Sequence, residues 1–305
     1  MHIATPLADA PALARPGQRL RLKLELLQPS GSFKMRGVGH ACQVHAARGA
    51  RRLLSSSGGN AGLAVAHAGA RLGLPVRVVV PQTTGERARA LIRAQGAELL
   101  VHGASWQEAH EHLLGQLAEG DAFIHPFDDP LLWQGHASLV TEAAQQGPRP
   151  DVVVLSVGGG GLLCGVLQGL HAVGWHDVPV VAVETEGAHS LHAAVAAGAP
   201  VTLPAITSVA TSLGARRVCD AALDWTRRHP VHAVTVSDAQ AVQACLALAD
   251  AQRLIVEPAC GAALAAVRAP SLPQLRDAAD VLLVLCGGVT TPYPELQALA
   301  ARLGA

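Results

Sequence analysis

The sequence predicts an α/β fold in which mostly parallel sheets are covered by helices on both faces. Short β-branched runs alternate along the chain with alanine-rich stretches of helical length, and no repeat or low-complexity tract interrupts this alternation. Glycine-rich turns follow several of the runs. At 305 residues, half of them hydrophobic, the chain is long enough for two lobes with large cores.

The elements follow from this pattern in chain order. The alternation in Arg21-Leu22-Lys23-Leu24-Glu25 predicts a strand with Lys23 on its solvent-exposed face. The further predicted strands are Arg52–Ser56, Val76–Pro81, Glu98–Val101, Ala122–His125, Val152–Val157, Val180–Glu184, Ala233–Val236 and Val281–Leu285. The predicted helices between them are Gly59–Leu72, Thr84–Gln95, Trp106–Ala118, Leu131–Gln145, Leu162–Val173, Asp238–Ala251 and Glu257–Arg268. The segment Pro126–Pro130 is the predicted crossing between the lobes.

Charge and composition exclude several classes of partner. The 23 basic residues balance the 23 acidic ones without runs of like charge, so neither nucleic acid nor a membrane is the expected partner. A small neutral or zwitterionic ligand fits better. The six cysteines form no CxxC pair, which argues against a disulfide framework or a thiolate zinc site. The N-terminus lacks a basic segment followed by an apolar stretch, so a cytoplasmic protein is expected.

Lys34 is one of only two lysines, and it lies in the turn-rich Pro29-Ser30-Gly31-Ser32-Phe33-Lys34 before a predicted helix. A desolvated lysine can form a Schiff base or release its proton near neutral pH, which arginine cannot do. On its own, the position is equally compatible with a solvated residue in the first turn of a helix.

Two loops after predicted strands are typical of anion sites. Ser55–Gly62 presents hydroxyls and bare amides at a helix N-terminus, which suits a carboxylate or phosphate, although an ordinary capped turn would have a similar sequence. The four glycines Gly158–Gly161 let the backbone approach a phosphate closely. A nicotinamide oxidoreductase is the competing interpretation, because Glu184 ends the next strand. Its GxGxxG fingerprint fails in both registers, at Leu163 and at Cys164.

A lysine in a tight loop together with two anion-binding loops describes a pyridoxal-phosphate enzyme. The chain resembles the fold-type II enzymes of this kind, and among them the catabolic serine dehydratase/threonine deaminase family. The matching segments are Pro29–Lys34, Gly59–Gly62, Pro126–Pro130, Ser156–Gly161, Gly187–Ser190, Ile206–Val209, Glu257–Ala262 and Cys286–Gly288. The resemblance implies a two-lobed fold like that of the tryptophan synthase β subunit. Residues 1–32 and 131–305 would form the large cofactor-binding domain, and residues 33–130 the small one.

The resemblance also implies a function and a site. The activity would be β-elimination from L-serine and L-threonine, in a homodimer, with Lys34 as both Schiff-base lysine and base for the Cα proton. The cofactor residues would be Phe33, Lys34, Asn60, Gly158, Gly159, Gly160, Gly161, Leu162 and Cys286. The substrate carboxylate would bind at Ser57, Gly58, Asn60 and Ala61.

A monovalent cation is part of the same resemblance. Glu184 would bind it together with the backbone carbonyls of Gly158, Ala188, Leu213 and Ala215, and hard oxygen ligands suit K+. Because the chain ends soon after Cys286, no regulatory domain and no inhibition by isoleucine are expected. A β-replacing synthase or an amino-acid racemase on the same fold remains the alternative, with a nicotinamide oxidoreductase more distant.

Overall fold

The computed structural model describes residues 1–305 and contains two sheets. The larger is a six-stranded sheet in the order β1-β2-β10-β7-β8-β9, and the smaller a four-stranded sheet in the order β5-β4-β3-β6. The larger sheet consists of β1 (Leu7–Asp9), β2 (Arg19–Leu24), β10 (Asp280–Leu285), β7 (Val152–Ser156), β8 (Val180–Thr185) and β9 (Val231–Val236). The smaller consists of β5 (Glu98–Val101), β4 (Val76–Val80), β3 (Arg52–Ser55) and β6 (Asp121–Phe123). All neighbouring strands are parallel except β1 and β2.

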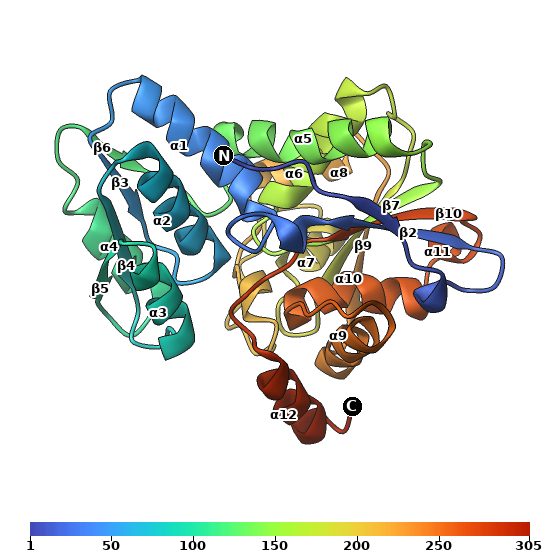
Figure 1. Cartoon of the computed structure of the whole chain (residues 1–305). Coiled ribbons are helices and arrows are strands. Elements are labelled where there is room, and N and C mark those ends of the chain that lie inside the picture. The colour runs from blue at the N-terminus through green and yellow to red at the C-terminus, as the bar shows by residue number, and fades with distance from the viewer.

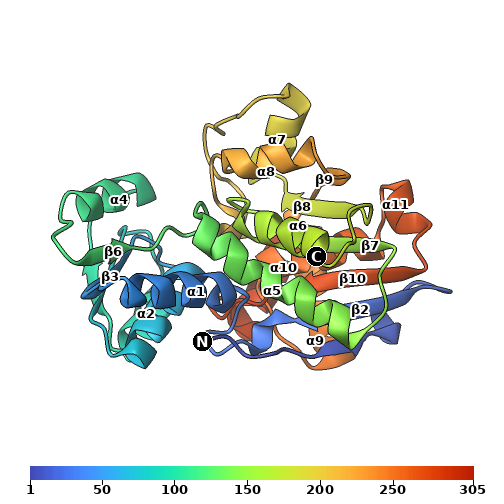
Figure 2. The same cartoon turned by 90° about the horizontal axis from the view of Figure 1, so that it is seen from above.

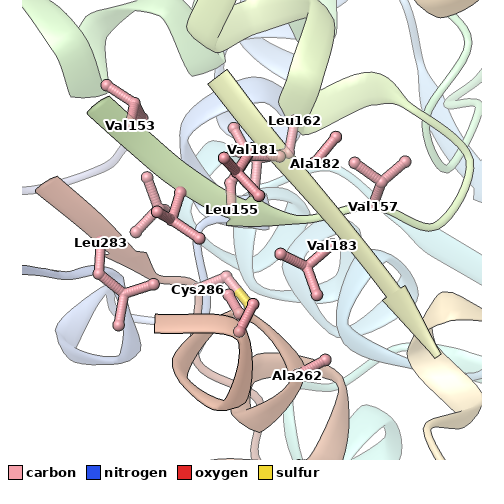
Figure 3. Packing of buried hydrophobic residues seen from close by; sticks show 14 of the residues in the cluster. Val153, Leu155, Val157, Leu162, Val181, Ala182, Val183, Ala262, Leu283 and Cys286 are labelled. Carbon is pink, nitrogen blue, oxygen red and sulfur yellow. The ribbon is translucent and has the colours of Figure 1, made fainter. Parts of the chain in front are cut away.

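Helices cover both faces of the larger sheet, which confirms the predicted class. In Figure 1, α5 (Pro130–Gln146) and α6 (Gly161–Ala172) lie above the sheet, and α9 (Asp238–Gln252) and α10 (Pro258–Arg268) lie below it. Strands buried on both faces are typical of parallel sheets and explain their continuous apolar runs. Figure 3 shows Val183 of β8, Leu283 of β10 and Ala262 of α10 packed in one core.

The two sheets have separate hydrophobic cores. One cluster of 57 buried residues surrounds the larger sheet, and another of 18 lies in the smaller lobe, so each sheet is stabilised by its own packing. The smaller lobe carries α2 (Asn60–Leu72), α3 (Glu86–Ala94) and α4 (Trp106–Leu114). Between the lobes, α1 (Lys34–Ala47) packs beside α5 (Figure 2). The domain boundaries at residues 32/33 and 130/131 stay a prediction.

Further elements complete the chain beyond those predicted. The remaining helices are α7 (Ser190–Ala197), α8 (Asp220–Thr226), α11 (Pro273–Arg276) and α12 (Tyr293–Leu303), and the short 3-10 turns are η1 (Pro11–Leu13), η2 (Glu25–Leu27) and η3 (Thr211–Leu213). None of the helices combines the length and the apolar composition that crossing a bilayer requires.

The prediction for Lys23 is wrong. Its side chain is 0% exposed, and its amine donates to Glu142 Oε2 and Gln146 Oε1, both at 2.9 Å, and to the Thr5 carbonyl. The alternation along β2 predicted that one face of the strand is exposed to solvent, but α5 covers that face. Arg21 and Lys23 therefore meet protein partners instead of water, whereas Arg19 at the start of the strand stays exposed.

Glu142 lies in a buried charge network with Arg36 and Lys23, and this predicts acid sensitivity. Burial alone would raise the pKa of Glu142, but hydrogen bonds from Arg36 and Lys23 outweigh it and lower the pKa to about 2. A depressed carboxyl pKa stabilises the fold above the unfolded value of 4.5, and this contribution is lost as pH falls toward 2. We expect the free energy of unfolding, measured by urea titration, to fall across this interval. Glu142→Gln should flatten that part of the profile, and an equally steep fall in the variant would contradict the assignment.

Candidate active site

The loop that carries Lys34 is tied to the end of β10. The Phe33 amide donates to the Cys286 carbonyl at 3.0 Å, and the Gly288 amide donates to the Gly31 carbonyl at 2.9 Å. Ser32 and Gly287 form an antiparallel bridge between the same segments. These bonds bring Lys34 and Cys286 together at the carboxyl end of β10, the edge where open α/β sheets bind ligands.

The amine of Lys34 is desolvated. Its Nζ donates to the Pro126 carbonyl at 2.5 Å and lies 5.1 Å from the centre of the Phe33 ring. Desolvation by burial lowers the pKa of Lys34 to about 8, while Cys286 and Glu257 oppose that shift. A larger fraction of this amine is therefore neutral near physiological pH than of an exposed lysine.

The glycine loop between β7 and α6, residues 158–161, forms a cradle with no room for side chains. Gly160 has φ +94°, a conformation that favours glycine. A Cβ added at Gly159 or Gly161 would collide with Phe127, so the bare backbone is required here. Ser156 Oγ, at the end of β7, is buried without a hydrogen-bond partner. The loop amides at the N-terminus of α6 can hold an anion such as phosphate.

The serine/glycine loop lies at the start of α2 and faces the larger lobe. Asn60 Nδ2 donates to Glu257 Oε1 at 2.8 Å and approaches Ser212 Oγ at 3.4 Å. Asn60 Oδ1 is buried without a partner. The Ser57 hydroxyl accepts from the Gly59 amide at 3.4 Å, and a Cβ at Gly59 would meet open space. The site therefore lies between the lobes, with Asn60 near the residues that frame Lys34.

Cys286 is a buried, neutral thiol. A hydrogen bond with Cys260 and burial raise the pKa of Cys286 well above its usual value. The Gly287 amide lies 3.5 Å from Cys260 Sγ. The side chain can therefore offer a ligand a weak hydrogen bond but no charge.

The residues predicted to bind a cation gather in two neighbouring groups. Glu184 accepts from the amides of Leu191 and His192 at 2.9 and 2.7 Å, and burial raises its pKa to about 7. Thr185 pairs with Ala188, which brings the latter near Glu184. A Cβ at Gly158 would lie 3.1 Å from Leu213 Cα, so these two residues are adjacent. No group of three or more His, Cys, Asp or Glu side chains is arranged to hold a metal ion, so backbone carbonyls would have to supply most ligands.

Several residues of the site were not singled out from the sequence. Pro126 accepts from Lys34, Phe127 packs against the glycine loop, and Glu257 pairs with Asn60. Ser212 and Thr290 also approach Glu257. Pro126 and Phe127 lie in the segment predicted to cross between the lobes, and Glu257 begins a predicted helix, but none of the three was given a role in the site. Ser212 and Thr290 had no signal.

The site fits pyridoxal phosphate. It combines a lysine of lowered pKa, a bare glycine cradle and buried polar atoms, Asn60 Oδ1 and Ser156 Oγ, that lack partners within the protein. Buried polar atoms without partners are costly, and the Ser156 hydroxyl could donate to a phosphate held by the glycine loop, which would relieve that cost.

Comparisons with known proteins agree with this chemistry. The sequence profile of the family described as "Pyridoxal-phosphate dependent enzyme" matches residues 1–287. The chain is 46% identical to L-serine dehydratase/L-threonine deaminase of Mus musculus, over 100% of this chain and 96% of the relative. It is also 46% identical to a serine dehydratase-like protein of Homo sapiens, over 99% and 95% of the two chains. The crystal structure of a fungal L-serine ammonia-lyase from Rhizomucor miehei superimposes with a TM-score of 0.90 at 37% identity, covering 99% of this chain and 98% of that one. A maize serine racemase has the same TM-score of 0.90 at 24% identity, which shows the shared fold alone.

Proposed function

The chain belongs to the family of pyridoxal-phosphate dependent enzymes, and from this premise we propose that it is an L-serine/L-threonine ammonia-lyase. The products would be pyruvate from L-serine or 2-oxobutanoate from L-threonine, with ammonia. The observation that carries the proposal is the desolvated Lys34 beside a bare glycine cradle, in a chain related along its whole length to serine dehydratases.

The residues that would hold the cofactor come from both lobes. Bound pyridoxal phosphate withdraws electrons from Cα and so acidifies its proton. Lys34 would hold it covalently, Phe33 would pack against its ring and Asn60 would bind its ring oxygen. Its phosphate would lie against Gly158, Gly159, Gly160, Gly161 and Leu162. Cys286 would face its ring nitrogen.

The protein's own groups suit elimination. With a pKa of about 8, Lys34 is poised to accept a proton near neutral pH. Cys286, as a neutral thiol, does not supply the charge that a carboxylate would provide at the ring nitrogen. Prompt loss of the β-hydroxyl is therefore favoured over transamination. The substrate carboxylate would bind Ser57, Gly58, Asn60 and Ala61, where the N-terminus of α2 attracts an anion.

A direct assay tests this function. The purified protein with added pyridoxal phosphate should show visible absorbance that borohydride abolishes, and should release keto acid from L-serine and L-threonine. Absorbance without keto acid would indicate a β-replacing synthase, a racemase or a binding protein. An enzyme that lacked the absorbance and reduced a nicotinamide would instead be the oxidoreductase.

The remaining proposals concern the surroundings of the site. K+ would bind Glu184 and the carbonyls of Gly158, Ala188, Leu213 and Ala215, and replacing K+ with tetramethylammonium should lower the rate of keto acid release.

We further propose a cytoplasmic homodimer that serves amino-acid catabolism. Light scattering of the purified protein would test the dimer.

Gly58 provides a test of the racemase alternative. In racemases of this fold, a serine precedes the Gly-Asn pair of this loop. In this chain the pair is Gly59-Asn60, and the residue before it is Gly58. Because glycine offers no proton donor, residual L-serine should contain no detectable D-serine after partial turnover. D-serine accumulating as fast as pyruvate would refute this argument from Gly58.

Gly58→Ser is expected to gain D-serine formation at the expense of pyruvate. A Cβ at this position would lie 2.6 Å from Thr84 Oγ1 and 2.7 Å from Thr84 Cγ2, so the Thr84 side chain has to turn away. Gly58→Ala adds the same Cβ without the hydroxyl and is the matched control. Chiral chromatography that finds equal D-serine with both variants would assign the effect to space and not to the hydroxyl.

A further inference from the structure

Glu257 is a buried carboxylate that the assigned roles leave unused. It is 4% exposed, and no arginine or lysine lies within ion-pair distance of it. It occupies the N-cap position of α10, where a carboxylate ordinarily binds the first amides of its own helix, but it makes no such bond. Its side chain turns instead toward the space between the lobes. Isolated buried charges are expensive unless they are hydrogen-bonded, so this arrangement needs a reason.

Three donors from separate segments surround the carboxylate. Asn60 Nδ2 at the start of α2 donates to Oε1 at 2.8 Å, and Thr290 Oγ1, beyond β10, donates to Oε2 at 3.0 Å. The Ser212 hydroxyl of η3 lies nearby and favours the charged form of the carboxyl, which opposes the rise in its pKa. A Cβ at Gly288 would collide with Glu257, so the backbone there leaves room for this side chain. One carboxylate thus joins the smaller lobe to two loops of the larger one.

The bond to Glu257 fixes which way the Asn60 amide points. A carboxylate only accepts hydrogen bonds, so the NH2 group of Asn60 must face it. Oδ1 is then turned away, and it is buried without a partner. Oδ1 is then available to a donor such as the substrate's ammonium group, and the second N–H of Nδ2 can donate to an oxygen of the cofactor or substrate.

Glu257 can also supply a negative charge opposite the Lys34 amine. The titratable groups that face Lys34 are Cys286 at the end of β10, Glu257 at α10, His125 before Pro126 and His136 of α5. Burial lowers the pKa of His125 to about 4 and that of His136 well below its usual value, so both are neutral. Cys286 is a neutral thiol, as is Cys245 beside Glu257, because burial raises the pKa of Cys245. Glu257 is the only carboxylate among these groups, and its side chain lies against Gly288, whose amide binds Gly31 in the loop that carries Lys34, so Glu257 is placed to set a negative charge opposite the lysine nitrogen.

We infer that Glu257 is a positioning residue, which orients the Asn60 amide toward the site and holds the negative charge that faces Lys34. This inference rests on the proposed function and deepens it. Burial raises the pKa of Glu257, while the hydrogen bonds from Ser212, Thr290 and Asn60 and the nearby Lys34 favour its charged form. The donors around it are those that a carboxylate, and not a carboxylic acid, would use.

Glu257→Gln removes the charge of this side chain and keeps its shape, so it tests the charge alone. Its amide oxygen can still accept from Asn60 Nδ2, and its NH2 can donate to Thr290, so the geometry is kept while the charge is removed. The readout is the visible absorbance of the holoenzyme, titrated from pH 6 to 10, which reports the protonation of the Lys34 nitrogen bound to the cofactor. We expect the titration of Glu257→Gln to move to lower pH by about one pH unit. Thr290→Val removes one hydrogen bond but no charge, so it should titrate like the wild type.

Each outcome decides the inference. An unchanged titration in a folded, cofactor-loaded Glu257→Gln would overturn it and leave the lyase assignment intact, whereas wild-type protein without borohydride-sensitive absorbance would overturn both. If Glu257→Gln does not fold, Glu257→Asp keeps the charge on a side chain that is one methylene shorter. It should titrate like the wild type but release the cofactor about tenfold faster on dilution, because Asn60 is no longer held. Wild-type release from that variant would contradict the positioning role.

Discussion

Lys34→Ala should lower keto acid release from L-serine by about four orders of magnitude, because it removes both the amine that holds the cofactor and the base at Cα. No other lysine can substitute. Lys23, the only other lysine, is held by Glu142, Gln146 and the Thr5 carbonyl on the far side of β2. The visible absorbance should vanish with the activity, which spectroscopy and a coupled assay for pyruvate would measure together.

The chain's two lysines make the controls simple. Lys34→Arg should fail as completely as Lys34→Ala, since a guanidinium cannot form the imine. Lys23→Arg keeps a charge in the buried network and should retain the absorbance. After borohydride reduction and proteolysis, the cofactor should be found on the peptide that contains Lys34. Recovery of the label on Lys23 would overturn the assignment.

The strands of the parallel sheets could be predicted because local sequence determines them. The central ones are short apolar runs buried on both faces, such as β7, which is followed by a turn with its own glycine signature. The prediction that Lys23 is exposed to solvent failed because of tertiary packing. Helix α5 covers the face of β2 that the alternation predicted to be exposed. Its partner Glu142 lies 119 residues away, and no local pattern encodes that pairing.

Part of the candidate site could likewise be predicted from local sequence, and part could not. Lys34 and the glycine loop were visible because lysine chemistry and bare backbone leave local signatures. Glu257 was not, since its interest comes from Asn60, which is 197 residues distant, and from Thr290. An acidic residue before Pro258 looks like an ordinary helix start. Only the fold shows that its carboxylate faces the other lobe.

The charge network beneath the site accounts for the last large effect that we expect. Arg36, two residues after Lys34, is fully buried and binds both oxygens of Glu25, at 2.7 and 2.9 Å, and both oxygens of Glu142, at 2.7 and 2.6 Å. Glu25 is itself 0% exposed and lies in η2, just after β2. The guanidinium therefore ties the first turn of α1, and the lysine on it, to β2 and α5.

Arg36→Met should lower the free energy of unfolding by about 3 to 5 kcal/mol, because it leaves Glu25 buried without a counter-charge. Arg19→Met is the matched control, since its partner Asp9 and Arg19 itself are about half exposed; it should cost less than about 1 kcal/mol. Adding Glu25→Gln to Arg36→Met should recover part of the loss, as the stranded charge is then gone. Urea unfolding of five proteins measures this: the wild type, Arg36→Met, Glu25→Gln, the double variant and Arg19→Met. Strictly additive losses would mean that the two side chains do not act as a pair.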